Sequence, residues 1–316
     1  MSDLDRAVQT VVRRCLAVQP GEDVVVVVDE PLQELGEQLR AAAQAVGGEA
    51  VLTVMSPRPT DGSEPPAPVA EALAASDVFI APASRSLSHT LARKRASERG
   101  ARGATMPHVT ADMLARLMAI DFDRLRTRSH AVAELLDRGT EAHVTCPRGT
   151  DLRLDLGGRT GIADDGDLTA RGAFGNLPCG EGFIAPAGGE GTMVARSLAA
   201  IGLTRGHPAR LTVAGGRLTD AEGPEGERLM GMLREHGDAG TNLAELGVGT
   251  NDRATLTGNV LEDEKILGTV HVAFGASIAI GGTVSVPIHL DCVVTDASLR
   301  VDGTSVLEEG RFVLAG

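Results

Sequence analysis

A histidine and an aspartate near the C-terminal end of the chain lie at a spacing that suits metal binding. His289 and Asp291 are two positions apart in an alternating run, so on a β-strand both side chains fall on one face, roughly 6.5 Å apart. Imidazole nitrogens and carboxylate oxygens are common metal ligands. An aspartate beside a histidine among Val, Ile and Leu is unfavourable without a partner. This pattern predicts a metal site.

A second histidine comes from the preceding predicted strand. The side chains of Thr269–Phe274 alternate, which places His271 on the face opposite to two valines and the phenylalanine. The other two residues belong to the predicted strand Val284–Val294, and a Gly281-Gly282 turn between the strands can bring all three together. An isolated histidine on a strand is usually just half-buried. Three ligand-type residues on polar faces within so short a stretch favour a shared ion.

Three glutamates upstream are further candidates. Glu181 lies between two glycines, where a backbone can approach a ligand closely. Glu245 lies in a predicted strand or turn between apolar residues. Taken alone, each is typical of a solvent-facing carboxylate. Glu264 belongs to the acidic run Glu262–Glu264, which precedes Lys265 and is either a surface turn or the source of a catalytic carboxylate.

Composition excludes several function classes. The net charge of −13 disfavours nucleic acid, which requires a basic face. With six Phe, no Trp and no Tyr, the chain has too few aromatic side chains for a surface that stacks on bases. The N-terminus lacks a basic region followed by an apolar core, so we expect no export signal. No apolar run in the sequence is long enough to cross a membrane. The four scattered cysteines form no C-x-x-C pair, so we expect reduced thiols in a cytoplasmic protein.

The chain has the pattern of an α/β protein with two domains. Residues 1–138 alternate strands and helices, which predicts an open, mainly parallel α/β domain; the expected strands are Asp23–Asp29, Glu49–Met55 and Asp77–Pro82. No G-x-G-x-x-G follows the first strand, so a dinucleotide site is not expected. A basic cluster is typical of a solvated helix face, with contact to a substrate carboxylate as the alternative; its members are Arg93, Lys94, Arg95, Arg99 and Arg102.

The pattern changes after residue 138. Short strands and glycine-rich turns over residues 139–316 predict a β-rich, metal-binding C-terminal domain that begins with a hairpin over Glu141–Leu156. We expect two helices to interrupt it, at about Gly191–Ala199 and at Pro224–His236.

Four motifs spread over residues 175–291 resemble the aminopeptidase T/aminopeptidase S family of metallopeptidases. They are G-N-L-P-C-G-E-G-F-I-A-P, A-E-L-G-V-G-T-N, D-E-K-I-L-G-T-V-H-V-A-F-G and I-H-L-D. The resemblance implies an α/β N-terminal domain, a β-rich domain that carries two divalent ions, and a homodimer. The ligands that it implies are Glu181, Glu245, His271, His289 and Asp291. The family also uses a tyrosine seven residues after the first histidine, where this chain has Ile278.

The first functional hypothesis is a metal-dependent hydrolase of a peptide or amide N-terminus, with Zn, Mn, Co or Fe as the ion. Asp291 or Glu181 would bridge two ions, and Glu245 or Glu264 would move a proton. The missing tyrosine weighs against peptidase activity but leaves the ligands intact.

Two alternatives stay open. A second branch of the same superfamily is the iron-dependent 2,5-dihydroxypyridine ring-cleaving dioxygenase, and His271, His289 and Asp291 form the ligand set of a non-haem Fe(II) site with open positions. The other alternative is a non-catalytic member that binds a peptide or biosynthetic partner, which the loss at Ile278 favours. In each case the expected partner is a small molecule or peptide rather than nucleic acid or membrane.

Overall fold

The computed structural model describes residues 1–314, which divide into two compact units. The first unit comprises Met1–Ile120 and Gly166–Cys179, and the second comprises Asp121–Asp165 and 180–314. The sequence predicts a division at residue 138. In the structure, helix α6 (Phe122–Arg138) lies in the second unit, and Gly166–Cys179 belongs to the first. The expected fold class, a parallel α/β part followed by an antiparallel β-rich part, is confirmed.

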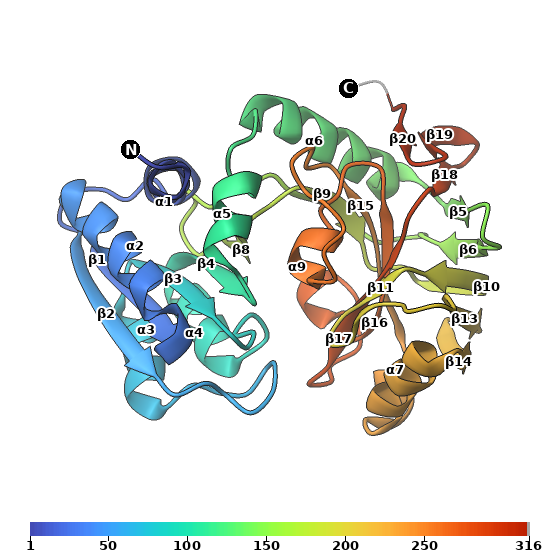
Figure 1. The fold of residues 1–316 in the computed structure, drawn as a ribbon, viewed down its shortest axis with the longest axis horizontal. Coiled ribbons are helices and arrows are strands. Elements are labelled where there is room, and N and C mark those ends of the chain that lie inside the picture. Colours follow the sequence, from blue (N-terminus) through green and yellow to red (C-terminus); the bar gives the residue numbers. More distant parts are fainter. Residues whose placement is uncertain (315–316) are drawn as a thin grey trace. The chain divides into compact units, whose positions relative to one another are not determined.

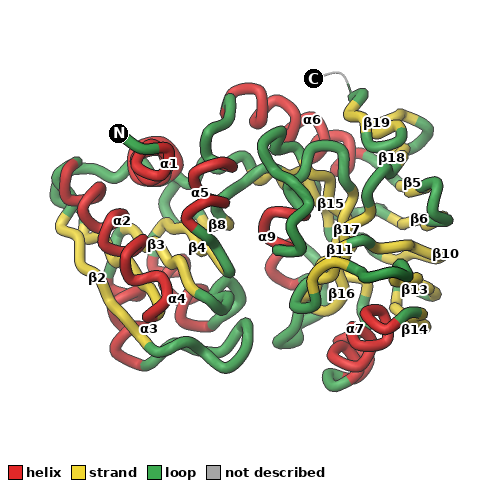
Figure 2. Tube along the Cα trace, in the orientation of Figure 1, coloured by secondary structure: helices red, strands yellow, loops and turns green. Residues whose placement is uncertain are grey.

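The first unit is built on one five-stranded parallel sheet with the order β2-β1-β3-β4-β8 (Figure 1). Its strands are β1 (Asp23–Asp29), β2 (Glu49–Met55), β3 (Val78–Ala83), β4 (Arg102–Pro107) and β8 (Phe174–Asn176). Its helices are α1 (Asp3–Thr10), continued by a π-helical turn at Val11–Cys15, α2 (Gln33–Ala45), α3 (Ala67–Ala75), α4 (Leu91–Arg99) and α5 (Ala111–Leu117). In Figure 2 these helices flank the strands of the sheet.

Helices cover both faces of the parallel sheet, and this explains the unbroken valine run of β1. Val25 and Val27 pack in one cluster with residues of α3 and α4. On the other face, Gly36 of α2 lies so close to Val28 that an added Cβ would meet its side chain at 2.6 Å. A strand buried on both faces has no polar side, so its sequence does not alternate.

Arg102 departs from the expectation that the basic cluster is a solvated helix face. It lies on β4 with 9% of its surface exposed. Its guanidinium group donates to the carbonyl oxygens of Leu16 and Ala17 at 2.8 and 3.2 Å, and to both carboxylate oxygens of Glu22 at 2.8 and 2.6 Å. Arg102 therefore ties the end of the first helical segment to the sheet.

The second unit contains two antiparallel sheets. The eight-stranded sheet has the order β14-β13-β10-β6-β5-β18-β19-β20, and the seven-stranded sheet has the order β12-β11-β17-β16-β15-β9-β7. Strands of the first are β5 (Glu141–Thr145), β6 (Asp151–Asp155), β10 (Gly188–Ala195), β13 (Ala209–Ala214), β14 (Arg217–Glu222), β18 (Ser298–Val301), β19 (Thr304–Glu308) and β20 (Arg311–Phe312). Strands of the second are β7 (Ile162–Asp164), β9 (Glu181–Ile184), β11 (Ser197–Leu198), β12 (Gly202–Leu203), β15 (Leu243–Gly249), β16 (Val270–Gly275) and β17 (His289–Val294).

One apolar cluster joins the two sheets. Val144 and Leu152 come from the eight-stranded sheet, and Leu246, Val248 and Val272 come from the seven-stranded sheet. Helix α6 contacts β7 and β9, and helix α7 (Pro224–Arg234) contacts β13 and β14. The short helices α8 (Gly237–Gly240) and α9 (Val260–Asp263) complete the unit. Over residues 1–314, no helix is long and apolar enough to span a membrane.

The helix expected at Gly191–Ala199 is wrong. Residues up to Ala195 belong to β10, which pairs with β6 and β13, and Ser197-Leu198 forms β11. Met193 and Ala195 both pack into the apolar cluster between the sheets. A strand with a hydrogen-bonded neighbour on each side satisfies its backbone groups, which outweighs the local helix propensity of the alanine-rich end.

Replacing Arg102 with Met should lower the free energy of unfolding of the first unit by about 2–3 kcal/mol. This value already allows for solvent screening, because part of the Glu22 surface is in water. The hydrogen bond from Arg102 lowers the pKa of Glu22 below its usual 4.5, so this stabilisation is present above pH 4.5 and is lost as the pH falls below it. Thermal unfolding at pH 7 and pH 4 measures both effects.

Arg95→Met is the matched control, because the Arg95–Glu71 pair is exposed on both sides. We expect it to cost less than about 1 kcal/mol. Equal losses for the two variants at pH 7 would contradict a special role for Arg102.

Candidate metal centre

Five predicted ligands project from one face of the seven-stranded sheet. The apolar Val270, Val272 and Phe274 of β16 belong to the cluster between the sheets, so the alternation turns His271 to the opposite face, as expected. The register then fixes the remaining ligands. Ala273 of β16 lies between Glu245 of β15 and Asp291 of β17, and Gly275 lies beside His289.

Glu181 reaches the same face from β9, where it pairs with Gly249 of β15. The structure therefore brings together side chains from four strands that are far apart in the sequence. Strand β17 is shorter than the predicted strand Val284–Val294, because it begins at His289. Ala276–Ile288 is a loop with a 3-10 turn at Ile278–Ile280. His289 and Asp291 still share a face, because both lie within the strand.

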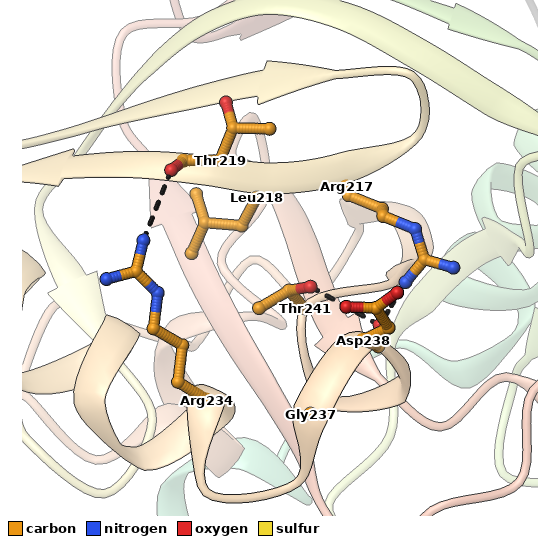
Figure 3. A pocket seen from close by; sticks show the side chains of 7 residues that line it. All are labelled: Arg217, Leu218, Thr219, Arg234, Gly237, Asp238 and Thr241. Atoms are coloured by element: carbon orange, nitrogen blue, oxygen red, sulfur yellow. Dashed lines mark hydrogen bonds between the residues drawn. The ribbon is translucent and has the colours of Figure 1, made fainter.

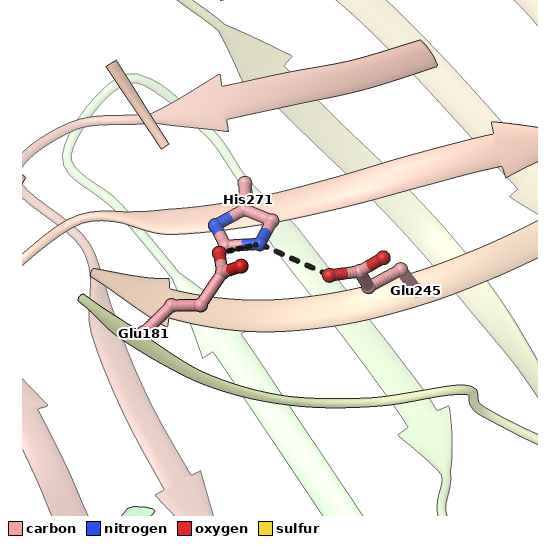
Figure 4. A group of neighbouring side chains, drawn as sticks. All are labelled: Glu181, Glu245 and His271. Carbon is pink, nitrogen blue, oxygen red and sulfur yellow. Dashed lines mark hydrogen bonds and ion pairs between the residues drawn. The ribbon is translucent and has the colours of Figure 1, made fainter. Parts of the chain in front are cut away.

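Glu181, Glu245 and His271 form one group of donors (Figure 4). The Nε2 atom of His271 lies 3.2 Å from Oε2 of Glu181 and 3.4 Å from Oε1 of Glu245. All three residues are buried; His271 is completely inaccessible and each glutamate keeps 7% of its surface. One ligand atom from each residue lies within 4.8 Å of the others, which is close enough to surround one cation.

Glu245, His289 and Asp291 form a second group that shares Glu245 with the first. The Nε2 atom of His289 lies 3.2 Å from Oε2 of Glu245 and 3.6 Å from Oδ1 of Asp291. Its Nδ1 atom lies 2.7 Å from the carbonyl oxygen of Ala276, so that nitrogen carries the proton and donates it. Nε2 is then the ring nitrogen available to an ion, the arrangement typical of metal-binding histidines.

The donor set fits a divalent cation. Oε2 of Glu181 and Nδ1 of His271 are buried without a hydrogen-bond partner, and a buried unpaired carboxylate oxygen costs about 1–3 kcal/mol. Two imidazoles with three carboxylates is a nitrogen and oxygen set that suits Zn, Mn, Co or Fe. A cation among these atoms would satisfy the unpaired oxygen and reduce the repulsion between the carboxylates.

Where no ion is bound, protons on the two histidines compensate part of the carboxylate charge. Burial alone would lower the pKa of His271, but the carboxylates of Glu181 and Glu245 raise it well above 6.5. Burial would also lower the pKa of His289, but the carboxylates of Asp291 and Glu245 raise it well above 6.5. In the other direction, the two histidines hold the pKa of Glu245 well below its usual value despite the burial of that carboxylate.

The acidic run Glu262–Glu264 is not a surface turn. Glu262 is 1% exposed and accepts from the backbone N–H and hydroxyl of Thr255 at 2.8 and 3.0 Å. Asp263 is completely buried and accepts from the hydroxyl of Ser197 at 2.6 Å. These two acids hold the preceding loop in place. Glu264 is also buried, and its carboxylate lies 2.8 Å from the Nζ atom of Lys265.

Lys265 was not expected at the site. Its Nζ atom donates to Oε1 of Glu181 at 2.5 Å, and only 1% of its side chain is exposed. In the sequence, a lysine after three acids is typical of a solvated charge run. Lys265 was linked to the site only by its place in the D-E-K-I-L-G-T-V-H-V-A-F-G motif, four residues before the predicted strand Thr269–Phe274.

Gly247 provides the space that His271 occupies. It lies directly beside His271 in the register, and a Cβ added to it would lie 2.0 Å from Nε2 of the imidazole. Because Nδ1 of His271 has no hydrogen-bond partner, packing against this glycine helps to set the orientation of the ring. In the sequence, Gly247 is one glycine of the A-E-L-G-V-G-T-N motif, and it had no assigned role there.

Ile278 occupies the place where the resemblance implies a tyrosine. It lies in the 3-10 turn with 56% of its surface exposed, and an alkyl side chain can neither donate nor accept a proton. Among the described residues, the proton-transfer groups at the site are its carboxylates, its imidazoles and the ammonium group of Lys265.

A pocket elsewhere in the second unit does not have this chemistry. It has a volume of about 330 Å³ and lies between β14 and the α7–α8 segment (Figure 3). Two arginines line it, but Arg234 donates to the carbonyl oxygen of Thr219 at 3.4 Å and Arg217 donates to that of Asp238. Asp238 is the single carboxylate among the lining residues, so this pocket is not a metal site.

Binding of a divalent cation should release protons and should weaken as the pH falls. The raised pKa values of His271 and His289 mean that an ion competes with protons for their Nε2 atoms. We expect roughly one to two protons released per ion at pH 7, and tighter binding at pH 8 than at pH 6. Calorimetric titration in buffers of different ionisation enthalpy measures the protons; an affinity that does not change with pH would contradict histidine ligation.

Gly247→Ala should weaken cation binding by about tenfold or more, because its methyl group displaces the His271 ring from its place. Gly231→Ala is the control: Gly231 lies on the exposed side of α7, and nothing lies within 4 Å of its would-be Cβ. Titration of both variants with Co(II) measures the difference. Wild-type affinity in a folded Gly247→Ala protein would show that this glycine does not position the ligand.

Comparison with solved structures shows the same fold in two neighbours. The "Structure of 2,5-dihydroxypridine Dioxygenase from Pseudomonas putida KT2440" has a TM-score of 0.83 at 20% identity and covers 100% of this chain and 99% of that one. "Wild-type AmpT from Thermus thermophilus" has a TM-score of 0.71 at 18% identity and covers 98% and 99%. At these identities the likeness shows the fold alone. No curated protein matches the chain.

A family model gives the family of the chain. Together with the two shared folds it supports the expected superfamily, but membership of the aminopeptidase T/aminopeptidase S family is not confirmed. The model described as "NicX: 2,5-dihydroxypyridine 5,6-dioxygenase" matches residues 3–314, nearly the whole described chain. The chain therefore belongs to the NicX family.

Proposed function

We propose that this protein is an Fe(II)-dependent dioxygenase that cleaves the ring of a small hydroxylated aromatic compound, with a hydroxypyridine as the first substrate to test. The family match over residues 3–314 carries this proposal, because it covers the metal-site residues and names a ring-cleaving dioxygenase. Among the comparisons, the hydrolase, which was the first hypothesis from the sequence, is supported only by a fold likeness at 18% identity.

The side chains present suit such a centre. His271, His289 and Asp291 would hold the ion. His271 groups with Glu181 and Glu245, and His289 and Asp291 group with the same Glu245. When bound, Fe(II) in a site of two histidines and one carboxylate supplies open positions at which oxygen and a substrate can meet. His289 and Asp291 are the more accessible ligands, with 12% and 13% of their side chains exposed, so we infer that the substrate approaches from their side.

Glu264 is the proposed proton carrier. Its burial, with a further contribution from the nearby carboxylates of Asp291 and Glu181, raises its pKa to about 8 even though Lys265 opposes the shift. A carboxyl group with this pKa is mostly protonated near neutral pH. A bound cation would lower the value towards neutrality. Glu264 could then take a proton from a substrate hydroxyl group and return it to the product.

A two-ion hydrolase is the second candidate, and one observation favours it. The donors form two groups of three that share Glu245, and a shared carboxylate is what bridges two ions in hydrolytic centres. In this alternative Glu181 and His271 would hold one ion, and His289 and Asp291 the other. The exposed Ile278 weighs against it, because no phenol is present to assist.

Oxygen uptake and metal content together test the proposal. After anaerobic loading with Fe(II), the protein is mixed with a panel of mono- and dihydroxypyridines in an oxygen electrode, and with aminoacyl p-nitroanilides under Zn, Mn and Co. We expect Fe(II)-dependent uptake of one O2 per ring consumed, one ion per chain, and no amide hydrolysis. His289→Ala and Asp291→Ala should lose at least about 100-fold of this activity.

His143→Ala is the matched control, because this histidine lies on β5 and binds Asp151 at 2.7 Å rather than a predicted ligand. It should retain wild-type activity. Two ions per chain with amide hydrolysis in the absence of oxygen would instead favour the second candidate. The expected homodimer and cytoplasmic location stay predictions.

A further inference from the structure

Lys265 is buried among three carboxylates beside the metal centre. Its Nζ atom lies 2.5 Å from Oε1 of Glu181, 2.8 Å from Oε1 of Glu264 and 3.8 Å from Oδ2 of Asp164. The contact with Glu181 is a hydrogen bond, and the contacts with Glu264 and Asp164 are ion pairs. With 1% of its side chain exposed, Lys265 cannot contact a substrate in solution.

The two oxygens of Glu181 have different surroundings. Oε1 accepts the hydrogen bond from Lys265. Oε2 has no hydrogen-bond partner and faces Nε2 of His271 at 3.2 Å. The lysine thus engages one oxygen and leaves the other pointing towards the donors of the first group.

We propose that Lys265 is a positioning residue that holds Glu181 so that only Oε2 is presented to the metal ion. This inference rests on the proposed function in one respect: Glu181 must be a ligand of the resident ion. A carboxylate free of such a contact can offer both oxygens to one ion, or turn away from it. Residues that orient a ligand in this way typically change metal affinity by about 10–100-fold when removed.

The choice of residue supports this role. Of the 30 lysines and arginines in the chain, only Lys94 and Lys265 are lysines. A compact ammonium group is a point charge that fits between three carboxylates, whereas a planar guanidinium group prefers to bind one carboxylate through two parallel bonds. Arginine at this position would engage both oxygens of Glu181 and withdraw Oε2 from the ion.

The backbone places Lys265 rigidly. Its N–H donates to the carbonyl oxygen of Glu262 at 3.0 Å, and its own carbonyl accepts from the N–H of Asn251 at 2.9 Å. Glu262 is in turn held by Thr255. The buried Glu262 therefore helps to hold Lys265 in place, and Lys265 in turn holds Glu181.

Co(II) titration of four proteins tests the inference: wild type, Lys265→Met, Glu181→Gln and the double variant. We expect Lys265→Met to weaken Co(II) binding by about 10–100-fold and to change the visible absorption of the bound ion, because the coordination by Glu181 changes. The double variant should bind no more weakly than Glu181→Gln alone, because Lys265 acts through that glutamate. Lys94→Met, the same change at an exposed position, should behave as wild type.

Several results would overturn the inference. One is a folded Lys265→Met protein with wild-type affinity and spectrum, and another is a Glu181→Gln protein with wild-type affinity; the second leaves the dioxygenase proposal standing on His271, His289 and Asp291. Should Lys265→Met fail to fold, Lys265→Met/Glu264→Gln also replaces the carboxyl group that Lys265 contacts at 2.8 Å, and it is compared with Glu264→Gln alone. The expected Co(II) changes without any oxygen uptake would support the inference and count against the proposed function.

Discussion

Repulsion among buried carboxylates is the constraint on which the second unit depends. Glu181, Glu245 and Glu264 each keep only 7% of their surface exposed, and Asp291 lies among them. Burial raises the pKa of Glu264, and the charges of Asp291 and Glu181 raise it further. Buried charges of one sign persist only when cations compensate them. One ammonium and two imidazoles provide that compensation within the protein, and a divalent cation would complete it.

The two-sheet architecture makes this concentration of charge tolerable. The face of β15, β16 and β17 that is turned away from the ligands packs into the apolar cluster between the sheets. That packing fixes the register, and the register fixes which ligands are neighbours. Small residues lie between the ligands, because Ala273 separates Glu245 from Asp291 and Gly247 lies against His271. Larger side chains at those two places would fill the space that the donors share.

Sequence patterns predict local features of this site well, because a period of two decides which face of a strand each residue occupies. His271, His289 and Asp291 were placed on the correct face in this way. The inclusion of Glu181 and Glu245 depended on a family resemblance, since pairing between distant strands leaves no local signal. The same limit explains strands β4 and β8, which the sequence did not predict, and the misplaced helix at Gly191–Ala199.

Burial of the charged run could not be predicted for a related reason. A sequence of three acids and a lysine has the composition of a solvated turn, and only tertiary partners reverse that expectation. Those partners are distant for Lys265, whose main contact is Glu181, and for Asp263, which accepts from Ser197. The nearest local clue is the pair of threonines in the loop before the run, at Thr255 and Thr257, which donate to Glu262 and Asp263.

The number of ions at the centre depends on Glu245. Its two oxygens face different histidines, at 3.4 Å from Nε2 of His271 and 3.2 Å from Nε2 of His289. A single iron bound by both histidines requires the rings to converge on one point, whereas two ions would keep the carboxylate between them as a bridge. Gly247 limits the ring of His271, and the carbonyl of Ala276 holds Nδ1 of His289. Because a hydrogen bond holds the ring of His289 and Gly247 lies against the ring of His271, movement of the carboxylate would let one ion bind both histidines. The choice between the two chemistries therefore depends on how freely Glu245 can leave its position between the rings.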